Sequence, residues 1–560
     1  MLPLRTYLIC LPVLLLLSLL ACKSKLPDKR QTKIVTDPAS MNDVVRESLK
    51  LLVNTESETS RDSMDIHFPK AVKTYYEKNN FSPIWSNTER FTPLADSMIT
   101  YLEHAYRDGL FPETYRAGIL KSLKKRTTED SIKSDALFWA KADLLFTDEL
   151  FHLLQDLGQG RLQPESMSWK NKETSFPTVF FAPLDSLRAG GLLTVVLQLA
   201  QPTHTNYKLL KSSARKFIDS MDSRSYTYMA YPFKDSLAFT KKLVIRLGES
   251  GIEMNSKSLP DSVNLAGSIK KYQHMKGLKI DGKITAFLAK TLNNTDREKF
   301  KRIAITLDRY KQLPRKMPEK YIWVNLPAYN LKLISSDSIV FQSKIICGKP
   351  GTPTPQLTSA ITDMVIYPTW TIPSSIIVKD KMLVRLQQNA GYLEQKGFYL
   401  LNNKGEKVDP YAVNWAKYSK TIPFNVQQGS GDDNALGVIK FNFNNPYAVY
   451  LHDTNQRYLF NNSLRSLSHG CVRVQDWKKL AAYLVQNDSI MAKATDTLRV
   501  NVDSIMNWVA AKKKHVVAVK NKFPLFIRYF GCEVINGNIK FYDDIYSDDK
   551  LLREKYFDGN

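Results

Sequence analysis

The sequence predicts an α+β protein with several domains, in which a helical N-terminal half precedes a β-rich C-terminal half. At 560 residues the chain has room for three or more domains, and its 43% of hydrophobic and 11% of aromatic residues are ordinary for globular structure. Apolar residues recur at helical spacing between residues 63 and 293. Strand-like alternation begins only at residue 321. This order of patterns favours separate helical and β-rich domains.

The chain begins with a segment that has the form of a bacterial lipoprotein signal peptide. A basic residue precedes an apolar run from Leu8 to Leu20, and at about 13 residues this run is too short for a hydrocarbon core that needs about 20. Ala21 stands directly before Cys22, as in a lipobox. We therefore expect a signal peptide over residues 1–22 that ends at a lipidated Cys22, and a polar tether over residues 23–62. The alternative is an ordinary secreted protein in which this cysteine occurs by chance.

Cysteine count and net charge bear on the compartment and the partners. After Cys22 the chain holds Cys347, Cys471 and Cys532, an odd number that leaves at least one thiol unpaired in an oxidising compartment. A bridge between Cys347 and Cys532 stays open. The formal net charge of +24 would suit nucleic acid, but a leader of this kind directs the protein out of the cytoplasm, so we expect no nucleic-acid partner. The basic surface would instead face cell-wall carboxylates, anionic headgroups or plain solvent.

Residues 63–235 predict an all-helical domain. Helical spacing of apolar residues covers 68–76, 94–102 and 136–157, and turn residues at 108–112 and 158–164 interrupt it. We find no group of catalytic residues in this region, so its aromatic side chains are expected in the core.

Residues 236–293 predict a compact helical unit. Leu265, Ile269 and Tyr272 keep helical spacing, a turn follows at 276–282, and Thr285–Leu292 is a further amphipathic helix. A basic helix within residues 294–318 then connects this unit to the next domain.

Residues 319–520 predict a β-rich domain with a long insertion. Strand signals lie at 321–325, 330–335, 338–346, 364–367, 437–443, 448–452 and 497–502, with a helix at 476–486. The interval from about 374 to 431 breaks the pattern, and a loop of this length in a compact domain is usually functional or disordered. Residues 521–560 carry apolar patches that we expect to pack back on this domain.

The chemistry of the β-rich domain is concentrated in Ser468-His-Gly-Cys-Val-Arg473, read together with His452. Cysteine attacks as a thiolate, and an ordinary thiol pKa of about 8.5 leaves little thiolate at neutral pH. A neighbouring imidazole that takes the proton removes this handicap. Gly470 allows a tight turn that would direct the N–H groups of Gly470 and Cys471 at a developing oxyanion. The pattern predicts a Cys471 nucleophile beside a histidine.

This pattern resembles the signature of the L,D-transpeptidases with a YkuD-type catalytic domain. The resemblance rests on His452, the sixteen residues from Asp453 to Ser468, and the His-Gly-Cys-Val-Arg that follows. The flanks 348–355, 368–373 and 434–441 are also similar. The match favours the long branch of the family, which implies a helical scaffold domain, a small three-helix peptidoglycan-binding module, and a β-rich sandwich with a capping insertion.

The resemblance also implies roles for individual residues. Cys471 is then the nucleophile, His452 the general base, His469 an assisting residue that shapes the site, and the Gly470 N–H an oxyanion donor. The candidates for substrate binding are Arg473, Tyr450, Trp370 and Asn434. Arg473 either orients a substrate carboxylate or braces the loop, and Tyr450 and Trp370 either line the cleft or pack in the core.

The activity implied is a cysteine L,D-transpeptidase that forms 3-3 cross-links between peptidoglycan stem peptides through a thioester acyl-enzyme. The resemblance, together with the leader, implies a periplasm-facing lipoprotein with stem peptides as donor and acceptor. It also implies inhibition by carbapenems and no metal or organic cofactor. Water or a protein lysine as acceptor would instead give an L,D-carboxypeptidase or a protein-to-wall anchoring enzyme. A non-enzymatic alternative is a wall-binding scaffold that uses residues 236–293, although such a unit can also serve as a spacer.

A zinc site is the alternative for the motif itself. His452, His469 and Cys471 are all possible zinc ligands, but the motif offers no convincing fourth ligand and no C-x-x-C pair.

The leader yields the first prediction. Replacing Cys22 with Ala removes the residue that would carry the lipid, so the variant should leave the membrane fraction. Fractionation of cells that produce the two proteins measures this. Tight membrane association of the variant would show that the leader stays as an anchor or that another contact dominates.

Overall fold

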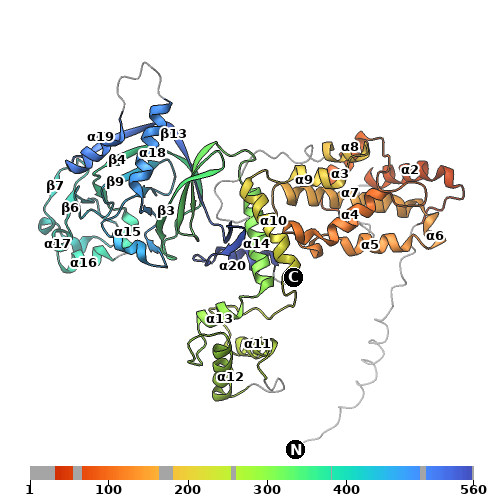
Figure 1. The fold of residues 1–560 in the computed structure, drawn as a ribbon, viewed down its shortest axis with the longest axis horizontal. Coiled ribbons are helices and arrows are strands. Elements are labelled where there is room, and N and C mark those ends of the chain that lie inside the picture. Colours follow the sequence, from red (N-terminus) through yellow and green to blue (C-terminus); the bar gives the residue numbers. More distant parts are fainter. Residues whose placement is uncertain are drawn as a thin grey trace, which may run out of the picture. The chain divides into compact units, whose positions relative to one another are not determined.

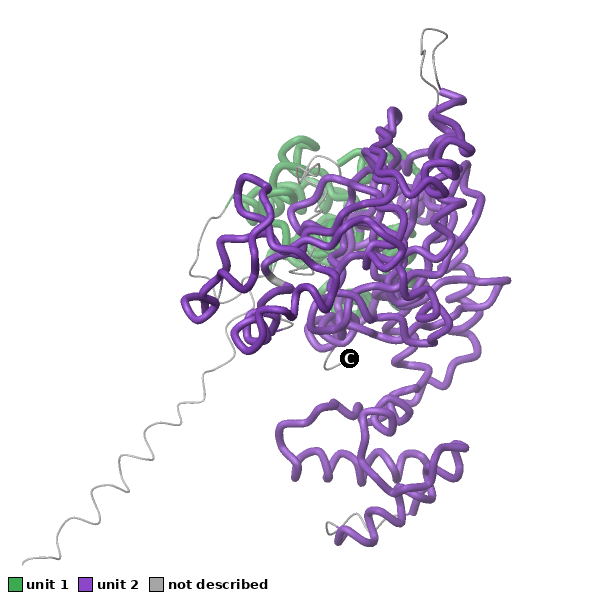
Figure 2. Tube along the Cα trace, turned by 90° about the vertical axis from the view of Figure 1, so that its left-hand side faces the viewer, with its two compact units in different colours: residues 1–103, 115–153, 176–193 green, residues 104–114, 154–175, 194–560 purple. Residues whose placement is uncertain are grey.

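The computed structural model describes residues 32–54, 66–162, 181–253, 260–379, 381–419, 421–491 and 500–557. The expected signal peptide, Cys22 and residues 23–31 and 55–62 of the expected tether lie outside this part of the chain. Within the described residues, no helix combines the length and apolar character that a membrane span requires. The chain divides into two compact units, residues 1–103, 115–153 and 176–193 and residues 104–114, 154–175 and 194–560 (Figure 2).

The first unit is helical, as the sequence predicts for residues 63–235. The prediction of a polar tether over residues 23–62 is wrong for residues 38–54, because α2 buries Met41, Val45 and Leu49 and packs against α3. It contains η1 (Pro38–Ser40), α2 (Met41–Asn54), α3 (Pro69–Lys78), α4 (Pro93–Glu103), α5 (Ala117–Arg126), α6 (Asp130–Lys133), α8 (Phe181–Arg188) and most of α7 (Ala136–Gly158). One buried carboxylate organises its interior: Asp143 accepts hydrogen bonds from the Tyr76 hydroxyl at 2.6 Å and the Trp85 N–H at 2.8 Å. Burial raises the pKa of Asp143 to about 6.

The second unit begins with helices and continues into the sheet. Besides the three helices within residues 236–293, its helices outside the sheet domain include η2 (Ala105–Asp108), η3 (Pro112–Thr114), α9 (Leu193–Ala200), α10 (Thr205–Ser220), α14 (Asp296–Lys311) and α20 (Asp548–Phe557). The sequence predicts α14 as a basic connecting helix, yet its residues from Ile303 to Lys311 are buried, and it packs against α10 and α20. Arg309 is fully buried, and its ion pairs with Asp549 at 2.5 Å and Asp548 at 3.0 Å compensate the buried charge.

The compact unit predicted over residues 236–293 has three helices, α11 (Ser236–Glu249), α12 (Ser262–Met275) and α13 (Ala286–Leu292), around a core of its own (Figure 1). The helix starts follow from their caps, because Asp235, Asp261 and Thr285 each accept a backbone N–H of the first turn. Gln273 fixes the predicted turn by accepting the N–H groups of Asp281 at 3.0 Å and of the following glycine at 2.8 Å.

The β-rich domain is built on one nine-stranded sheet in the order β11-β3-β12-β10-β9-β4-β13-β1-β2. The strands are β1 (Lys320–Asn325), β2 (Asn330–Ser335), β3 (Ser338–Gly348), β4 (Leu357–Ile366), β9 (Ile439–Phe443), β10 (Leu451–His452), β11 (Ser466–Ser468), β12 (Val472–Val474) and β13 (His515–Arg528). Because β2 also pairs with β3, the sheet closes on itself around an apolar core. The expected sandwich is therefore one continuous, rolled sheet.

Helices complete this domain. α18 (Trp477–Ile490) packs on β13 and α19 (Val502–Ala510) on β4 (Figure 1), and η7 (Arg457–Asn461) lies in the segment before β11. The strand expected at 497–502 falls partly outside the described residues, and Val502 begins α19 instead.

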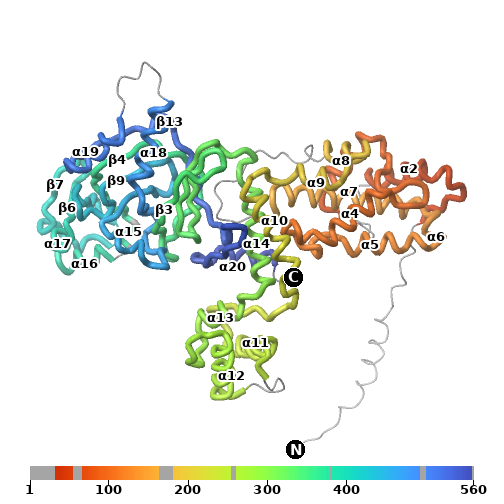
Figure 3. Tube along the Cα trace, viewed as in Figure 1, coloured from red at the N-terminus to blue at the C-terminus, as the bar shows by residue number. Residues whose placement is uncertain are grey.

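The C-terminal segment is part of the sheet rather than an addition to it. β13 crosses the expected boundary at residue 520 and lies between β4, antiparallel, and β1, parallel. Figure 3 shows this late strand among strands that come much earlier in the chain. A two-stranded hairpin, β14 (Cys532–Ile535) and β15 (Asn538–Phe541), then leads into α20.

The insertion predicted at about 374–431 is an ordered subdomain with its own core. It contains β5 (Trp370–Thr371), α15 (Ser374–Lys379), α16 (Met382–Gln388), α17 (Tyr392–Gln395), β6 (Phe398–Leu401), β7 (Lys407–Val408), η5 (Pro410–Ala412), η6 (Trp415–Lys417) and β8 (Asn425–Gln428). Its four strands pair in the order β5-β8-β6-β7. The pairing of β5 with β8 closes the insertion into a unit whose two ends meet.

Candidate active site

The predicted catalytic residues share one face of the sheet. β10 and β12 are parallel neighbours with His452 opposite Arg473, and β9 places Lys440 opposite His452 on the other side. Because side chains alternate along a strand, Tyr450 and Cys471, each two residues before His452 and Arg473, lie on this same face. Leu451, Val472 and Phe441 point to the other face and are buried in the core. Two short strands thus present the thiol, the imidazole and two cations together.

The immediate neighbour of the Cys471 thiol is Tyr450. The Val472 N–H donates to the Tyr450 carbonyl at 3.0 Å, which continues the ladder to this pair. Burial raises the pKa of the Cys471 thiol, whereas hydrogen bonding from Tyr450 and the charges of Lys440 and Arg473 oppose that rise. Burial also raises the pKa of Tyr450 far above its ordinary value. The resting cysteine is therefore a neutral thiol with a phenol as its partner.

His452 is buried and electrically neutral. Burial, together with the charges of Arg473 and Lys440, lowers the pKa of this histidine to about 3. Its Nδ1 is buried and has no hydrogen-bond partner in the described part of the chain. No hydrogen bond or ion pair between described residues joins it to Cys471, since the register places it one step beyond Tyr450. Hydrogen bonds to the backbone of Asp453 and Leu436 oppose the lowering of the His452 pKa. A neutral imidazole on the same face is still able to accept a proton, because catalytic hydrogen bonds are often long in the free state.

The loop that carries Cys471 is clamped by the segment after β3. Thr354 Oγ1 donates to the Gly470 carbonyl at 2.7 Å, and Thr352 Oγ1 donates to the Ser468 carbonyl at 3.2 Å. Within the loop, Ser468 Oγ donates to the Cys471 carbonyl at 2.6 Å. Gly470 has φ +125°, a conformation that a side chain would strain, which is the physical reason for glycine before the cysteine.

The two backbone N–H groups expected at an oxyanion are not equivalent. The Gly470 N–H already donates to Ser468 Oγ at 3.2 Å. The Cys471 N–H has no acceptor among the described residues. The Cys471 N–H is therefore the donor that is open to an oxyanion. The oxyanion role of Gly470 stays a prediction, because its N–H would first have to release Ser468 Oγ.

Arg473 keeps donor capacity on the catalytic face. Its Nη1 donates to Gln456 Oε1 at 3.2 Å, while its buried Nε has no partner in the described chain. Burial lowers the pKa of this arginine, a sign that it lacks a close carboxylate partner there. These two facts favour the substrate-carboxylate interpretation of Arg473 over the bracing one.

Lys440 is a site residue that the sequence analysis missed. Its Nζ lies 4.1 Å from the centre of the Tyr450 ring, and burial lowers its pKa. The signal was present in the alternation of residues 437–443, because pairing the two predicted strands through their turn places Lys440 opposite His452. The antiparallel pairing itself confirms the predicted hairpin.

The other two predicted binding residues come from the edge of the insertion. Trp370, half-buried on β5, hydrogen-bonds to Tyr450 and so brings the insertion close to Cys471, the predicted nucleophile. Asn434 is buried, and its amide bonds to the carbonyls of Pro368 and Gly429 and to the Leu436 N–H. That amide holds the return of the insertion to β9, and a contact of Asn434 with substrate stays a prediction.

His469 lies apart from the row of catalytic side chains. Its Nε2 is 3.4 Å from Lys349 Nζ, on the clamping segment. This contact is compatible with a shaping role, which stays a prediction. The ligand atoms of His452, His469 and Cys471 do not converge to metal-binding distance among the described residues.

Cys347 and Cys532 are free, buried thiols. Burial raises the pKa of Cys347 to about 11 and that of Cys532 to about 12. They lie in different apolar clusters, so the structure contains no bridge between them. Cys471 is the one partly exposed thiol of the described chain.

The protonation states give the second prediction. Because burial raises the pKa of Cys471, its alkylation by iodoacetamide should accelerate about tenfold per pH unit from about pH 6 to 9, without a plateau. The imidazole, with a pKa of about 3, is neutral throughout this window. Peptide mapping isolates the Cys471 rate. A plateau near neutral pH would reveal a preformed thiolate–imidazolium pair and would contradict the neutral resting state.

Two variants separate the roles of Tyr450 and His452. Tyr450→Phe keeps the ring beneath Lys440 but removes the hydrogen bond to sulfur, so alkylation should slow by about tenfold. His452→Ala should leave alkylation nearly unchanged and reduce turnover by about 10²–10⁴, the range of general base catalysis. If His452→Ala left turnover unchanged as well, the base would have to be another group, with His469 the first candidate.

Comparisons with known proteins agree with this geometry. The family described as "L,D-transpeptidase catalytic domain" matches residues 319–502, and the family described as "Scaffold domain" matches residues 70–213. A protein of Haemophilus influenzae named "Putative L,D-transpeptidase" is 33% identical over 231 residues, which are 41% of this chain and 45% of that protein. The chain thus spans about half the length of the curated relative it matches.

One solved structure, titled "Structure of the Ldtfm-avibactam carbamoyl enzyme", is also similar. It is 10% identical and covers 57% of this chain and 98% of its own, with a TM-score of 0.19. At that score it adds nothing to the argument. The two domain matches, with the helical N-terminal region and the β-rich sheet domain of the structure, confirm the predicted fold class. By these matches the chain carries the catalytic domain of the L,D-transpeptidase family over residues 319–502, with a Scaffold domain before it.

Proposed function

We propose that this protein is a cysteine L,D-transpeptidase that makes 3-3 cross-links between peptidoglycan stem peptides through a thioester acyl-enzyme. The observation that carries the proposal is the catalytic face of β10 and β12, where the only partly exposed thiol of the described chain lies beside Tyr450, His452, Lys440 and Arg473 within the matched domain.

Acylation starts from a neutral thiol and a neutral imidazole. The Cys471 sulfur attacks the carbonyl between the L- and D-centres of the donor stem, and the thiol proton passes to His452. Negative charge then develops on the carbonyl oxygen, and we assign the open Cys471 N–H as its donor. The C–N bond breaks, the leaving D-amino acid takes the proton back from His452, and a thioester remains on Cys471.

The cationic side chains give the face a preference for a carboxylate-bearing substrate. Lys440 and Arg473 both influence Cys471, and Arg473 retains an unpartnered Nε within the described chain. Guanidinium binds carboxylate in a two-pronged geometry that orients as well as attracts. A stem peptide carries such a carboxylate at its D-terminus. We assign its recognition to Arg473, with Lys440 adding charge.

The acceptor decides between cross-linking and hydrolysis. An amine must be positioned to compete with water, which is present at about 55 M, and effective molarities of 10⁵ M or more for oriented reactants make this feasible. The insertion is the candidate for this positioning, because Trp370 at its edge contacts Tyr450 beside the nucleophile. Its own apolar core makes it an ordered unit that can hold a fixed position beside Cys471. This observation favours the transferase over the carboxypeptidase.

The setting of the enzyme completes the proposal. Lipidation at Cys22 would hold it on a membrane facing the periplasm, where its substrate lies. The three-helix unit α11–α13 would bring the wall polymer near, as a binding module or as a spacer.

Covalent chemistry at Cys471 gives the third prediction. Incubation with isolated cell wall should yield 3-3 cross-linked muropeptides by mass spectrometry, and a carbapenem should add its mass to Cys471 alone. Cys471→Ser should abolish both, since an alcohol is a far weaker nucleophile here. Cys532→Ser is the matched control, because that thiol is buried with a pKa of about 12 and should keep full activity. An adduct on Cys347 or Cys532, or no adduct, would refute the assignment.

The insertion gives the fourth prediction. Residues 374–424 can be replaced by a short glycine-containing loop that keeps the β5–β8 pairing and therefore Trp370 in place. The ratio of cross-linked dimers to tripeptides in a muropeptide digest should fall, while carbapenem acylation of Cys471 survives.

The matched control shortens only the β6–β7 turn at 402–406, which leaves the core of the insertion intact. An unchanged ratio at normal turnover in the larger deletion would show that the insertion has no part in choosing the acceptor.

A further inference from the structure

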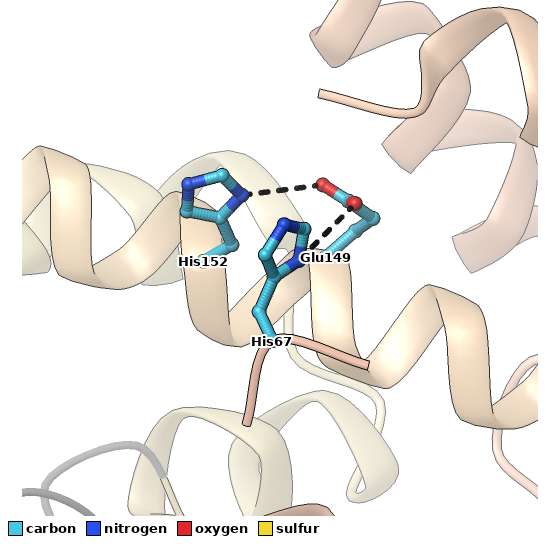
Figure 4. Close-up of side chains that lie close together, drawn as sticks. All are labelled: His67, Glu149 and His152. Atoms are coloured by element: carbon cyan, nitrogen blue, oxygen red, sulfur yellow. Dashed lines mark ion pairs between the residues drawn. The ribbon is translucent and has the colours of Figure 1, made fainter. Parts of the chain in front are cut away.

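A second cluster of chemically active side chains lies in the first unit, within its helices. Figure 4 shows His67, from the segment before α3, facing Glu149 and His152, one turn apart on α7. His67 Nδ1 is 4.0 Å from Glu149 Oε1, and His152 Nδ1 is 3.7 Å from Glu149 Oε2. The three ligand atoms lie within 4.8 Å of one another, and no other group of three in the described chain converges in this way.

Glu149 is the unusual member of the cluster. It is fully buried, at 0% exposure, and neither of its oxygens receives a hydrogen bond in the described chain. A buried carboxylate without hydrogen bonds is costly unless a charge compensates it. Both oxygens face the imidazoles, as Figure 4 shows, so the compensating charge is expected between them.

Arg116 does not supply that charge fully, because it faces two buried carboxylates. Its Nη1 lies 2.9 Å from Asp148 Oδ2 and 3.3 Å from Glu149 Oε1. One guanidinium against two carboxylates leaves the cluster one positive charge short of balance. Asp148 is well satisfied in its own right, since it also accepts the N–H groups of His67 at 3.0 Å and Phe68 at 2.8 Å.

We propose that His67, Glu149 and His152 form a binding site for a divalent transition-metal ion of the zinc class. Two imidazoles and one carboxylate are a donor set that suits Zn²⁺, whereas Mg²⁺ and Ca²⁺ prefer oxygen ligands throughout. The ion supplies the missing positive charge. Because the His67 side chain is 37% exposed, water reaches the site and fills the fourth position.

The observed spacing needs a modest contraction to reach coordination geometry. Ligand atoms about 2.0–2.1 Å from a tetrahedral ion lie roughly 3.3 Å apart, against 3.7 and 4.0 Å here. Glu149 and His152 are fixed on one helix, and Asp148 holds the backbone N–H of His67, so the approach falls to the partly exposed His67 side chain, which can turn about its own bonds. When its ring turns to the ion, His67 Nδ1 gives up two contacts, with Asp148 Oδ2 at 3.2 Å and with Arg116 Nη2 at 3.1 Å. Asp148 retains three other donors.

The site is distinct from the transpeptidase chemistry and has a structural role. It ties the segment before α3 to α7 inside the helical unit, which the proposed reaction does not involve. The site is independent of the proposed function, so metal binding and catalysis can fail separately.

The test uses the full chain, purified without an affinity tag and stripped with a chelator. Addition of Zn²⁺ should restore one equivalent per chain by native mass spectrometry and raise the unfolding temperature progressively with free Zn²⁺. Co²⁺ in its place should give the visible absorption of a four-coordinate ion. Glu149→Gln should lose all three signals. The metal-free variant should unfold at or above the temperature of the metal-free parent, because the buried charge is gone.

Further variants separate this site from metal binding elsewhere in the chain. His67→Ala, on an exposed segment, should also lose the equivalent, and it covers the case in which Glu149→Gln does not fold. His274→Ala removes an exposed histidine of α12 and should change nothing. Loss of the metal signals only in Cys471→Ala would locate the ion at the catalytic thiol and overturn the proposal. Absence of any Zn²⁺-dependent shift would overturn it too.

Discussion

The parallel pairing of β10 with β12 is the constraint on which the candidate active site depends. These strands are short, yet their register decides that Cys471 meets Tyr450 and that His452 meets Arg473. A shift of one residue would turn the thiol into the core and Leu451 or Val472 outward. The core prevents this, because both residues are almost fully buried on the opposite face. The chemistry of one face is therefore held in place by the hydrophobic packing of the other.

The end of the chain supports the same site from a distance in sequence. Tyr546, which follows β15, donates to the Gly348 carbonyl at 2.7 Å and accepts the Thr354 N–H at 3.2 Å. These residues belong to the segment that clamps the Cys471 loop. β13 meanwhile fills the position between β1 and β4. The last residues of the second unit are thus structural parts of the catalytic domain.

Much of this architecture could be predicted from the sequence, because local patterns determine it. The bounds of α7 and β2 and the hairpin of β9 and β10 follow from periodicity and turn residues. The sequence predicts α14 only as a basic connector because its partners, Asp548 and Asp549, lie more than two hundred residues later. Lys440 was missed because the alternation within one strand predicts which side chains share a face of the sheet, but not which residues of the adjacent strand lie opposite them. The position of His452 one step from the thiol likewise depends on register, which no local signal contains.

The charges of the catalytic face suggest when the nucleophile becomes active. Lys440 and Arg473 stabilise a thiolate but oppose an imidazolium, so in the free enzyme they help burial to hold the pKa of His452 at about 3, and little proton transfer occurs. An incoming carboxylate bound by Arg473 would cancel part of that positive field and raise the pKa of the imidazole. The oxyanion that forms during attack acts in the same direction. Under the proposed function the thiol would stay neutral until substrate arrives, and activation would accompany binding because the substrate brings negative charge that offsets Lys440 and Arg473.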